Sequence, residues 1–436
     1  MKGGEIIKIK KLSALILVFV MVILVFASKN EPGPPYDDLD GKTITVWSLD
    51  CEITLRALAD AAAIYQRINP DFVLRSVEMS QEEISMQITA AAASGTFELL
   101  PDIILMRDQI FHSKVTNYPE VFFNLTDSGI NFDDFAPAKA SLSVVESRNF
   151  GVPFDNDAVV MGLRTDIVGA MGFTVDDFTG ITWGRFIELG QIALFETGMP
   201  MVAAIAGGAD WIDYMARSAG VSMFNIYGNP NIVGNAVLRQ IVETYTELVK
   251  TGVLVEVSNR GAQIGSFVND VVVGAIGGYW ILDSIRQNPA HERLWAITNI
   301  PRLDVPGGTN SSGSGGSSWA VTSNANASLA IDFLKNTFAG SAELYATLLQ
   351  SDGVISAWLP AAESPAYQEM QVFFGRQRIF EDIIRFSINI PAFRYGEFHH
   401  EVISAIEIVV SNVLRGADID AELQAAQEFV ELQMQG

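Results

Sequence analysis

The first part of the chain after its N-terminal leader alternates between strand and helix patterns. Residues 42–47, 72–77 and 102–106 are short apolar or β-branched runs of the kind that form strands. Between them, residues 54–68 and 81–93 carry apolar side chains at helical spacing. Successive strand–helix–strand units form a parallel sheet with helices on both faces. The chain is therefore predicted to be an α/β protein.

The N-terminus has the pattern of a secretory signal, because a lysine-rich start precedes an apolar run over residues 12–27. We expect residues 1–27 to be a signal peptide and the polar, proline-rich residues 28–40 to be a flexible tether. The apolar run is short for a membrane span, although an uncleaved anchor stays an alternative. The mature protein is expected outside the cytoplasm.

Composition excludes several classes of partner. The net charge is −23, and such a surface repels nucleic acid phosphates and anionic membranes. Four histidines and one cysteine leave little for a zinc site. We expect no nucleic acid partner, no bound metal and no cofactor.

The motifs of common enzymes are missing. The Gly/Ser-rich stretch 307–318 lacks the Gly-Lys-Ser/Thr of a phosphate loop and the Gly-x-Ser-x-Gly of a nucleophile elbow. Strand patterns flank it, so we interpret it as a loop inside a folded lobe. His399 and His400 point apart on a helix, cannot hold one metal, and are expected to be solvated or partly packed. Nothing pairs the many acidic residues, so a binding protein is favoured over an enzyme.

A buried strand pattern at 271–276 ends in Gly277 and Gly278, and two large aromatic residues, Tyr279 and Trp280, follow at once. Glycines at a strand end let a ligand approach closely. Ligands of open α/β sheets lie beyond the carboxyl ends of the strands. Either the two rings face a ligand or they fill the core, and the sequence leaves both interpretations open.

Polar and aromatic side chains also follow the other predicted strands. Carboxylates and amides hydrogen-bond to hydroxyl groups, and aromatic rings stack on the C–H face of a sugar. The pattern therefore favours a polyhydroxylated ligand. The strand-end residues are Asp50 and Glu52, Asp108 and Gln109, residues 155–157, Asp210 and Trp211, and Tyr279 and Trp280.

Segments along nearly all of 41–436 resemble the extracellular solute-binding proteins of ABC transporters, in the family that includes maltose-binding and multiple-sugar-binding proteins. The order and spacing of the segments carry the resemblance. The matching segments are 42–47, 93–106, 151–168, 178–190, 266–280, 315–336, 359–367 and 414–430.

The resemblance implies the two-lobed periplasmic-binding-protein fold of type II, with parallel-sheet lobes, three crossovers and the ligand in the cleft. The N-terminal lobe would comprise 41–152 and 303–345, and the C-terminal lobe 153–302 and 346–436. Trp280 would be the stacking aromatic residue. With Tyr279 added from its position, the expected ligand-binding residues are Asp50, Cys51, Glu52, Asp108, Gln109, Asp157, Trp211, Tyr279, Trp280, Arg394 and Tyr395.

The resemblance also implies the function: an exported, monomeric component that binds a sugar or oligosaccharide and delivers it to the permease of an ABC importer. Two departures stand out. Ala27-Ser28 replaces the lipid-anchoring cysteine of many relatives, and 163–166 (LRTD) lacks the tyrosine of the usual Tyr-Asn-Lys-Asp. A ligand-binding partner of a membrane sensor and a secreted carbohydrate hydrolase remain as alternatives.

Overall fold

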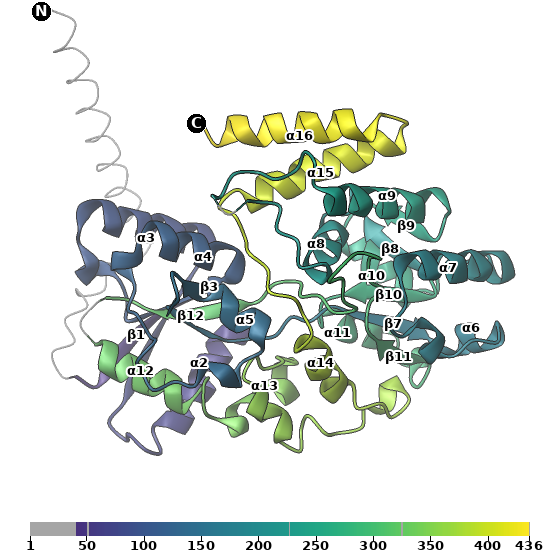
Figure 1. Ribbon diagram of the computed structural model, residues 1–436. Coiled ribbons are helices and arrows are strands. Elements are labelled where there is room, and N and C mark those ends of the chain that lie inside the picture. Colours follow the sequence, from purple (N-terminus) through teal and green to yellow (C-terminus); the bar gives the residue numbers. More distant parts are fainter. Residues whose placement is uncertain (1–40, 50–51, 226, 324–325, 436) are drawn as a thin grey trace, which may run out of the picture. The chain divides into compact units, whose positions relative to one another are not determined.

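The computed structural model describes residues 41–49, 52–225, 227–323 and 326–435 (Figure 1). The expected signal and tether, and Asp50 and Cys51 of the expected site, lie outside the described residues. The chain divides into two units, Met1–Gly41 and Lys42–Gly436. The second unit, described here, contains the folded elements.

Among the described residues, the largest sheet has five strands in the order β2-β1-β3-β12-β6. Strand β1 pairs in parallel with both β2 and β3, which confirms the parallel strands predicted from the first part of the chain. Strand β12 runs antiparallel to β3 and β6, so the sheet is mixed. The strands are β1 (Thr43–Leu49), β2 (Val73–Met79), β3 (Ile103–Arg107), β6 (Gly151–Pro153) and β12 (Ser317–Val321).

Helices accompany this sheet on both faces, as the alternating sequence pattern requires (Figure 1). Helix α3 begins at the point the sequence indicates, because Ser80 and Glu83 form a capping box, and it ends at Gly95 in the left-handed conformation. The helices of this part are α2 (Glu52–Tyr65), α3 (Gln81–Ser94), α4 (Asp108–Asn117), α5 (Pro137–Leu142) and α12 (Ala327–Asn336), and a small hairpin joins β4 (Val144–Val145) to β5 (Arg148–Asn149).

The strands of the other part of the unit form an antiparallel group in the order β10-β7-β11 and a parallel pair, β8 with β9. The antiparallel pairs were not expected, and they place the end of β10 beside the beginning of β7. The strands are β7 (Val160–Arg164), β8 (Val202–Ile205), β9 (Leu254–Val257), β10 (Gly274–Gly277) and β11 (Trp295–Thr298).

Six helices among the described residues belong to this second part, and their limits follow local signals. The Thr182 side chain accepts a hydrogen bond from the Arg185 amide at 3.2 Å, which confirms Thr182 as the predicted N-cap of α7. The helices are α6 (Thr165–Ala170), α7 (Trp183–Thr197), α8 (Ala209–Ser218), α9 (Ala236–Lys250), α10 (Arg260–Val268) and α11 (Ile281–Arg286).

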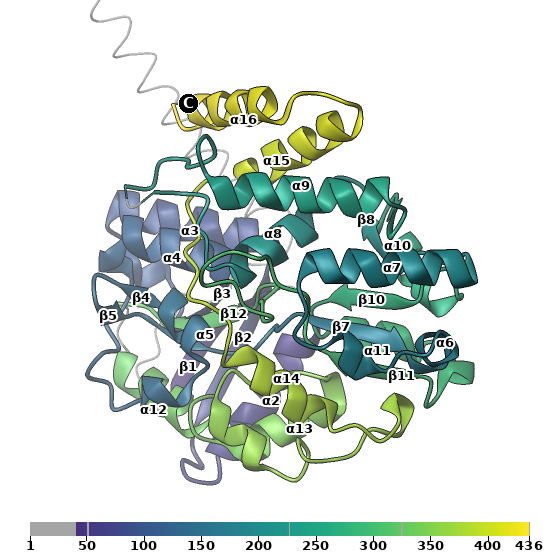
Figure 2. The same cartoon turned by 45° about the vertical axis from the view of Figure 1, so that its right-hand side comes forward.

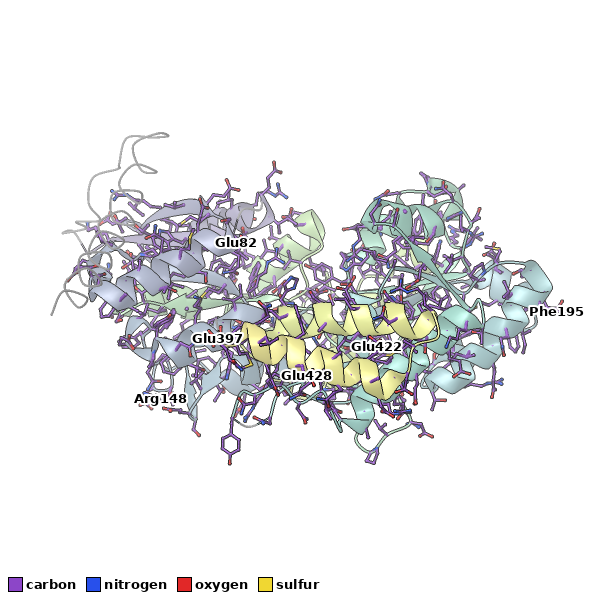
Figure 3. All side chains as sticks on the ribbon, turned by 90° about the horizontal axis from the view of Figure 1, so that it is seen from above. Glu82, Arg148, Phe195, Glu397, Glu422 and Glu428 are labelled. Atoms are coloured by element: carbon purple, nitrogen blue, oxygen red, sulfur yellow. The ribbon has the colours of Figure 1, made fainter. Side chains whose placement is uncertain are left out.

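The last quarter of the chain is helical. Helices α15 and α16 lie side by side, and α15 packs on α8 and α9 (Figures 2 and 3). None of the described helices is long and apolar enough to cross a membrane. The four helices are α13 (Ala342–Asp352), α14 (Ile379–Ser387), α15 (His399–Leu414) and α16 (Ile419–Gln433).

The buried side chains form two hydrophobic clusters, which we call the first core and the second core. The first core surrounds the five-stranded sheet, extends to β10, β11, α10 and α11, and includes Trp319 and Tyr345. The second core lies among β7, α7, α8, α9 and α15 and includes Trp183 and Trp211. Helix α13, which extends across residue 345, packs its buried residues into the first core.

Three backbone segments of the described chain, 154–159, 312–317 and 355–357, run beside one another. The Asn156 amide donates to the Ile355 carbonyl at 2.8 Å, and the Val159 amide donates to the Ser312 carbonyl at 2.7 Å. The Gly/Ser-rich stretch is therefore part of the folded unit, as expected, and its backbone is held by hydrogen bonds to 157–159.

Strand β11 is at the edge of its sheet, and a side chain covers that edge. The Ile297 amide donates to Oε1 of Gln377 at 2.8 Å, and Nε2 of Gln377 donates to the Ile297 carbonyl at 2.8 Å. The Gln377 amide thus makes the two hydrogen bonds that a neighbouring strand would make.

Candidate functional site

The strand directions bring three distant segments to one place. Strand β12 begins where β3 and β6 end. Asp108 follows β3, Asp155 follows β6, and Gly316 precedes β12, so these residues lie together. The antiparallel direction of β12, which the sequence did not predict, is what adds Gly316 to the group.

The Lys139 ammonium group, on α5, forms an ion pair with the Asp108 carboxylate, and both side chains are buried. The Ser318 hydroxyl also donates to Asp108, at 2.9 Å. Asp155 accepts a hydrogen bond from the Ser317 amide at 2.7 Å. A β-carbon on Gly316 would collide with Nζ of Lys139 and come within 3.0 Å of Asp155. Only glycine leaves room for the lysine here.

Asp157 is held in a similar way from the other side. Its carboxylate accepts hydrogen bonds from the Ser314 hydroxyl at 2.5 Å and from the Tyr279 amide at 3.3 Å. A β-carbon on Gly278 would collide with this carboxylate. Because β10 and β7 are antiparallel, the Gly-Gly-Tyr-Trp turn meets the segment that carries Asp157.

The carboxylates around Lys139 have perturbed acidities. Burial raises the pKa of Asp155 to about 6, and the charges of Asp108 and Asp157 add to the effect while Lys139 opposes it. Burial also raises the pKa of Asp157, against the hydrogen bond from Ser314 and the charge of Lys139. Both carboxylates therefore hold a proton more readily than an exposed aspartate does.

Helix α8 supplies a second charged group. Asp213 and Arg217, one turn apart, form a buried ion pair. The Arg217 guanidinium also lies 4.9 Å from the ring centre of Tyr395 and 5.5 Å from that of Phe393. Burial alone would raise the pKa of Asp213, but the charges of Arg217 and His399 outweigh it and hold that pKa below its usual range.

His399 is more buried than expected. Its Nε2 atom lies 3.3 Å from Oδ1 of Asp213, and its ring packs against the rings of Phe393 and Tyr395. Its neighbour His400 is exposed, as expected.

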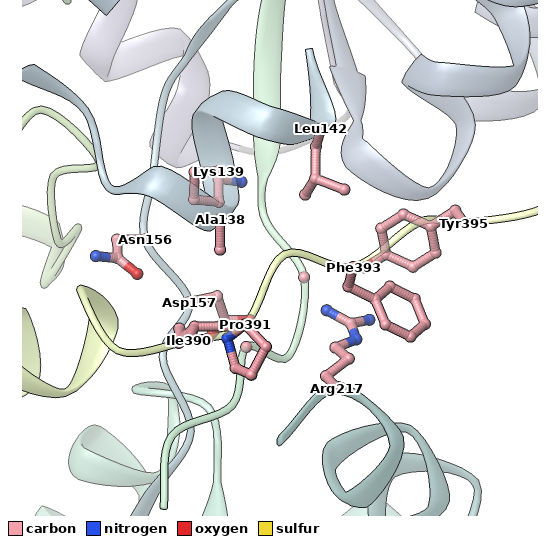
Figure 4. A pocket seen from close by; sticks show the side chains of 12 residues that line it. Ala138, Lys139, Leu142, Asn156, Asp157, Arg217, Ile390, Pro391, Phe393 and Tyr395 are labelled. Carbon is pink, nitrogen blue, oxygen red and sulfur yellow. The ribbon is translucent and has the colours of Figure 1, made fainter. Parts of the chain in front are cut away.

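Lys139, Asp157, Arg217 and Tyr395 are among the residues that line one pocket (Figure 4). Its cavity measures about 30 Å³, which is room for about one or two water molecules. Three polar atoms of its walls, Nε of Arg217, the hydroxyl of Tyr395 and Nδ2 of Asn156, are buried without a hydrogen-bond partner among the described residues. A buried polar group without a partner is unfavourable by about 1–3 kcal/mol, so the pocket is prepared for a polar ligand.

The structure brings four of the sequence-predicted residues together. Asp157 and Tyr395 line the pocket, Asp108 lies behind Lys139, and Tyr279 contacts Asp157 through its backbone amide. Trp280 follows directly and is half-buried, and the Arg260 guanidinium lies 4.4 Å from its ring centre.

The other described candidates do not line this pocket. Glu52 is exposed and pairs with Arg56, and Gln109 and Arg394 are also exposed. Trp211 is 1% exposed. It lies in the second core, because it falls in the first turn of α8, and its ring centre is 5.6 Å from that of Trp183.

Sequence reasoning missed Lys139, Arg217 and Phe393 entirely, and it included Asn156 only within the strand-end segment 155–157. Lys139 lies on the short helix α5, away from any strand end, and no local pattern marks it. Arg217 had one local signal, since it stands four residues after Asp213 on a helix.

No family model matches the chain. Solved structures of low sequence identity share its fold. The sugar-binding protein MalE of Xanthomonas citri superposes with a TM-score of 0.76 at 15% identity, over 90% of this chain and 98% of that one. The galacto-N-biose-/lacto-N-biose I-binding protein of Bifidobacterium longum gives 0.67 at 16%, over 90% and 96%. The fold is thus that of the two-lobed, MalE-type binding proteins, as predicted.

One relative is closer in sequence. The lactose-binding protein of Rhizobium radiobacter is 32% identical over 393 residues, which cover 90% of this chain and 93% of that protein. The chain therefore belongs to the extracellular solute-binding proteins of ABC transporters, family 1. It is a substrate-binding component of that class, which confirms the substrate-binding role that the resemblance implied.

Proposed function

We propose that this protein binds a galactoside, with lactose as the first candidate, in the pocket between α5, α8 and residues 390–395. The main support for this proposal is that Arg217, Tyr395 and Asn156 each have a buried polar atom at one cavity without a hydrogen-bond partner among the described residues. Sugar hydroxyl groups both donate and accept, so one ring could satisfy all three. The name of the Rhizobium relative suggests the galactoside.

The cavity of about 30 Å³ is far below the roughly 300 Å³ of a small ligand site, so binding requires the walls to separate first. We propose that the two lobes meet at the three adjacent segments near 155, 314 and 356 and rotate about them. The limits near 152, 302 and 345 that the resemblance implied would divide α13, so the proposal moves them to these segments. Rotation about such a hinge is the usual closure of two-lobed binding proteins.

Aromatic stacking would come from Tyr395, at the pocket, and from Trp280, beyond Asp157. Glu52, Gln109 and Arg394 are exposed and would meet the ligand only at the rim. The ring of Trp211 is buried in the second core, so our proposal assigns it no direct contact.

The remaining parts of the proposal concern the protein's surroundings. It would be exported by residues 1–27, act as a monomer without a lipid anchor, deliver its sugar to a membrane permease and catalyse no reaction. Mass spectrometry of native material tests the export step. A mature chain that starts near Ser28 is expected, and an intact Met1 would show a retained anchor.

A thermal-shift screen against a carbohydrate library tests the ligand class. A sugar at 100 times its dissociation constant should add about 2.7 kcal/mol to the free energy of unfolding. The proposal fails for galactosides if neither lactose nor any other galactoside raises the melting temperature. Turnover of a chromogenic glycoside would instead reveal a hydrolase.

Tyr395→Phe tests the site. It deletes a buried hydroxyl that has no partner among the described residues, so the stability of the protein without ligand should stay the same or rise. Affinity for the sugar should fall roughly 3- to 10-fold, the loss of about one hydrogen bond. Tyr227→Phe is the control, because Tyr227 is 81% exposed. Unchanged affinity in Tyr395→Phe would place the ligand elsewhere.

A further inference from the structure

The charges of the side chains in and behind the pocket walls do not sum to zero. Within the described residues, four carboxylates in and directly behind these walls face two permanent cations and His399, an excess of two negative charges, or of one when His399 is protonated. The groups are Asp108, Asp155, Asp157 and Asp213 on one side and Lys139 and Arg217 on the other.

The excess charge is not spread evenly. Asp108 is paired with Lys139, and Asp213 is paired with Arg217. Asp155 and Asp157 instead accept hydrogen bonds from neutral groups, two backbone amides and one hydroxyl. The uncompensated negative charge is therefore concentrated on the segment 155–157, along one side of the cavity.

We propose that the pocket selects its sugar by charge, favouring an amino sugar over a neutral sugar and a neutral sugar over one that carries a carboxylate, and that Asp155 is a residue that sets this order. The inference rests on the proposed function, because it concerns the same pocket.

Position separates the roles of the two aspartates. Asp157 lines the cavity, where its carboxylate can accept hydrogen bonds from ligand hydroxyl or ammonium groups. Asp155 is not among the lining residues and lies behind Gly316, close to Lys139. Asp155 therefore acts on the ligand through its charge, without a contact that a substitution would remove.

Burial makes that charge effective. Charges interact several-fold more strongly in a partly desolvated site than in water. Burial raises the pKa values of both Asp155 and Asp157; at Asp155 the charges of Asp108 and Asp157 add to this effect while Lys139 opposes it, and at Asp157 the charges of Lys139 and Arg217 oppose it. An incoming carboxylate would meet the same repulsion, and an ammonium group would relieve it.

The charged and titratable groups that face Asp155 come from three helices and its own segment. They are Lys139 on α5, Asp108 on α4, Asp157 two residues on, and the phenol of Tyr345 on α13. The pKa of Asp155 is about 6. The preference for an amino sugar over a sugar with a carboxylate should thus weaken as the pH falls from 7 to 5, because Asp155 becomes protonated.

Titration calorimetry at pH 7.0 with galactose, galactosamine and galacturonate tests the proposal, since the three differ mainly in charge. If the thermal-shift screen shows that only disaccharides bind, the sugars compared are lactose and its derivatives with an amino group or a carboxylate on the galactose ring. We expect galacturonate to bind at least about 10-fold more weakly than galactose, and galactosamine to bind more tightly.

Asp155→Asn tests the residue, because the amide oxygen can still accept from Ser317. The affinity for galactose should change less than about twofold, and the ratio of the affinities for galactosamine and galacturonate should shrink about 10-fold. Asp127→Asn, at an exposed position, removes the same charge far from the pocket walls and should leave the ratio unchanged. In the unmutated protein the ratio should also shrink at pH 5.

The outcomes are distinct. Galacturonate bound as tightly as galactose would overturn charge selection and leave sugar binding intact. An equal change for all three sugars in Asp155→Asn would mean that Asp155 acts through structure. If no galactoside of any charge binds, the proposed ligand class fails, and charge selection among galactosides fails with it.

Discussion

Trp280 shows how strongly one residue depends on its neighbours. It stands at the start of α11 rather than in a strand, and its half-buried side chain packs against the first core. The Arg260 guanidinium lies 4.4 Å from the ring centre and is itself held by Asp210 at 2.6 Å. A cation therefore already occupies one face of the ring, and a sugar would stack on the other face or displace the arginine.

Trp280→Ala should weaken sugar binding by roughly 10- to 100-fold, because the ring loses both its contact area and its stacking on the sugar. The free energy of unfolding without ligand should fall by less than the roughly 3–5 kcal/mol of a fully buried tryptophan. Calorimetry and urea denaturation measure the two effects, with Tyr279→Ala as the neighbouring control. A large loss of stability with normal affinity would assign the ring to the core.

Asp155 makes stability depend on pH. Its pKa is raised from 3.8 to about 6 in the folded protein, so the folded state holds the proton more tightly than the unfolded chain does. The protein should therefore lose stability as the pH rises from about 4 through 6. A shift of about two units corresponds to at most about 3 kcal/mol, and we expect about 1–2 because Asp155 keeps some contact with solvent.

Asp155→Asn should remove this penalty, so the variant should be more stable than the parent at pH 8 and nearly equal to it at pH 4. Urea denaturation at both values measures the difference. Asp127→Asn should show no such trend. A gain in stability of equal size at both pH values would show that the titration of Asp155 is not its cause.

Among the elements, the turn between β10 and α11 is the most constrained by its surroundings. Gly278 lies against the Asp157 carboxylate and within 2.5 Å of the Ser314 hydroxyl, measured from the position of an added β-carbon. Either the turn or Asp157 must move to accept a side chain, and the hydrogen bond to the Tyr279 amide would then be lost.

Gly278→Ala should consequently reduce sugar affinity at least about 10-fold and destabilise the protein by about 1–3 kcal/mol. Gly169→Ala on α6 is a matched control, because nothing lies within 4 Å of its added β-carbon. In a helix that change should be neutral or stabilising by up to about 1 kcal/mol. Normal affinity in Gly278→Ala would show that this turn does not shape the site.

The elements also show what a sequence can and cannot predict. Strands β1 to β3 and helix α3 follow from local patterns of apolar residues and caps, and the structure confirms them. The direction of β12 depends on where the chain re-enters the sheet, which no local pattern encodes. Lys139 and Arg217 reach the pocket only through such long-range arrangements, so they were missed, whereas Asp157 and Tyr395 were predicted to be near a ligand and line the pocket.

At the scale of the whole folded unit, the small cavity and the hinge that we propose at the three adjacent segments predict a change of shape with ligand. X-ray scattering should show a smaller radius of gyration after the addition of a sugar that the thermal-shift screen identifies, because the open lobes close on it. A sugar that does not bind is the control. An unchanged profile at saturation would contradict closure about the hinge.

The Gln377 side chain also matters for the behaviour of the protein in a crowded solution. A bare edge strand is a template on which a second chain can add, and such addition is a common start of aggregation. By making both backbone hydrogen bonds of Ile297, Gln377 removes that template at the middle of β11. The loop that carries Gln377 thus protects the protein from pairing with copies of itself.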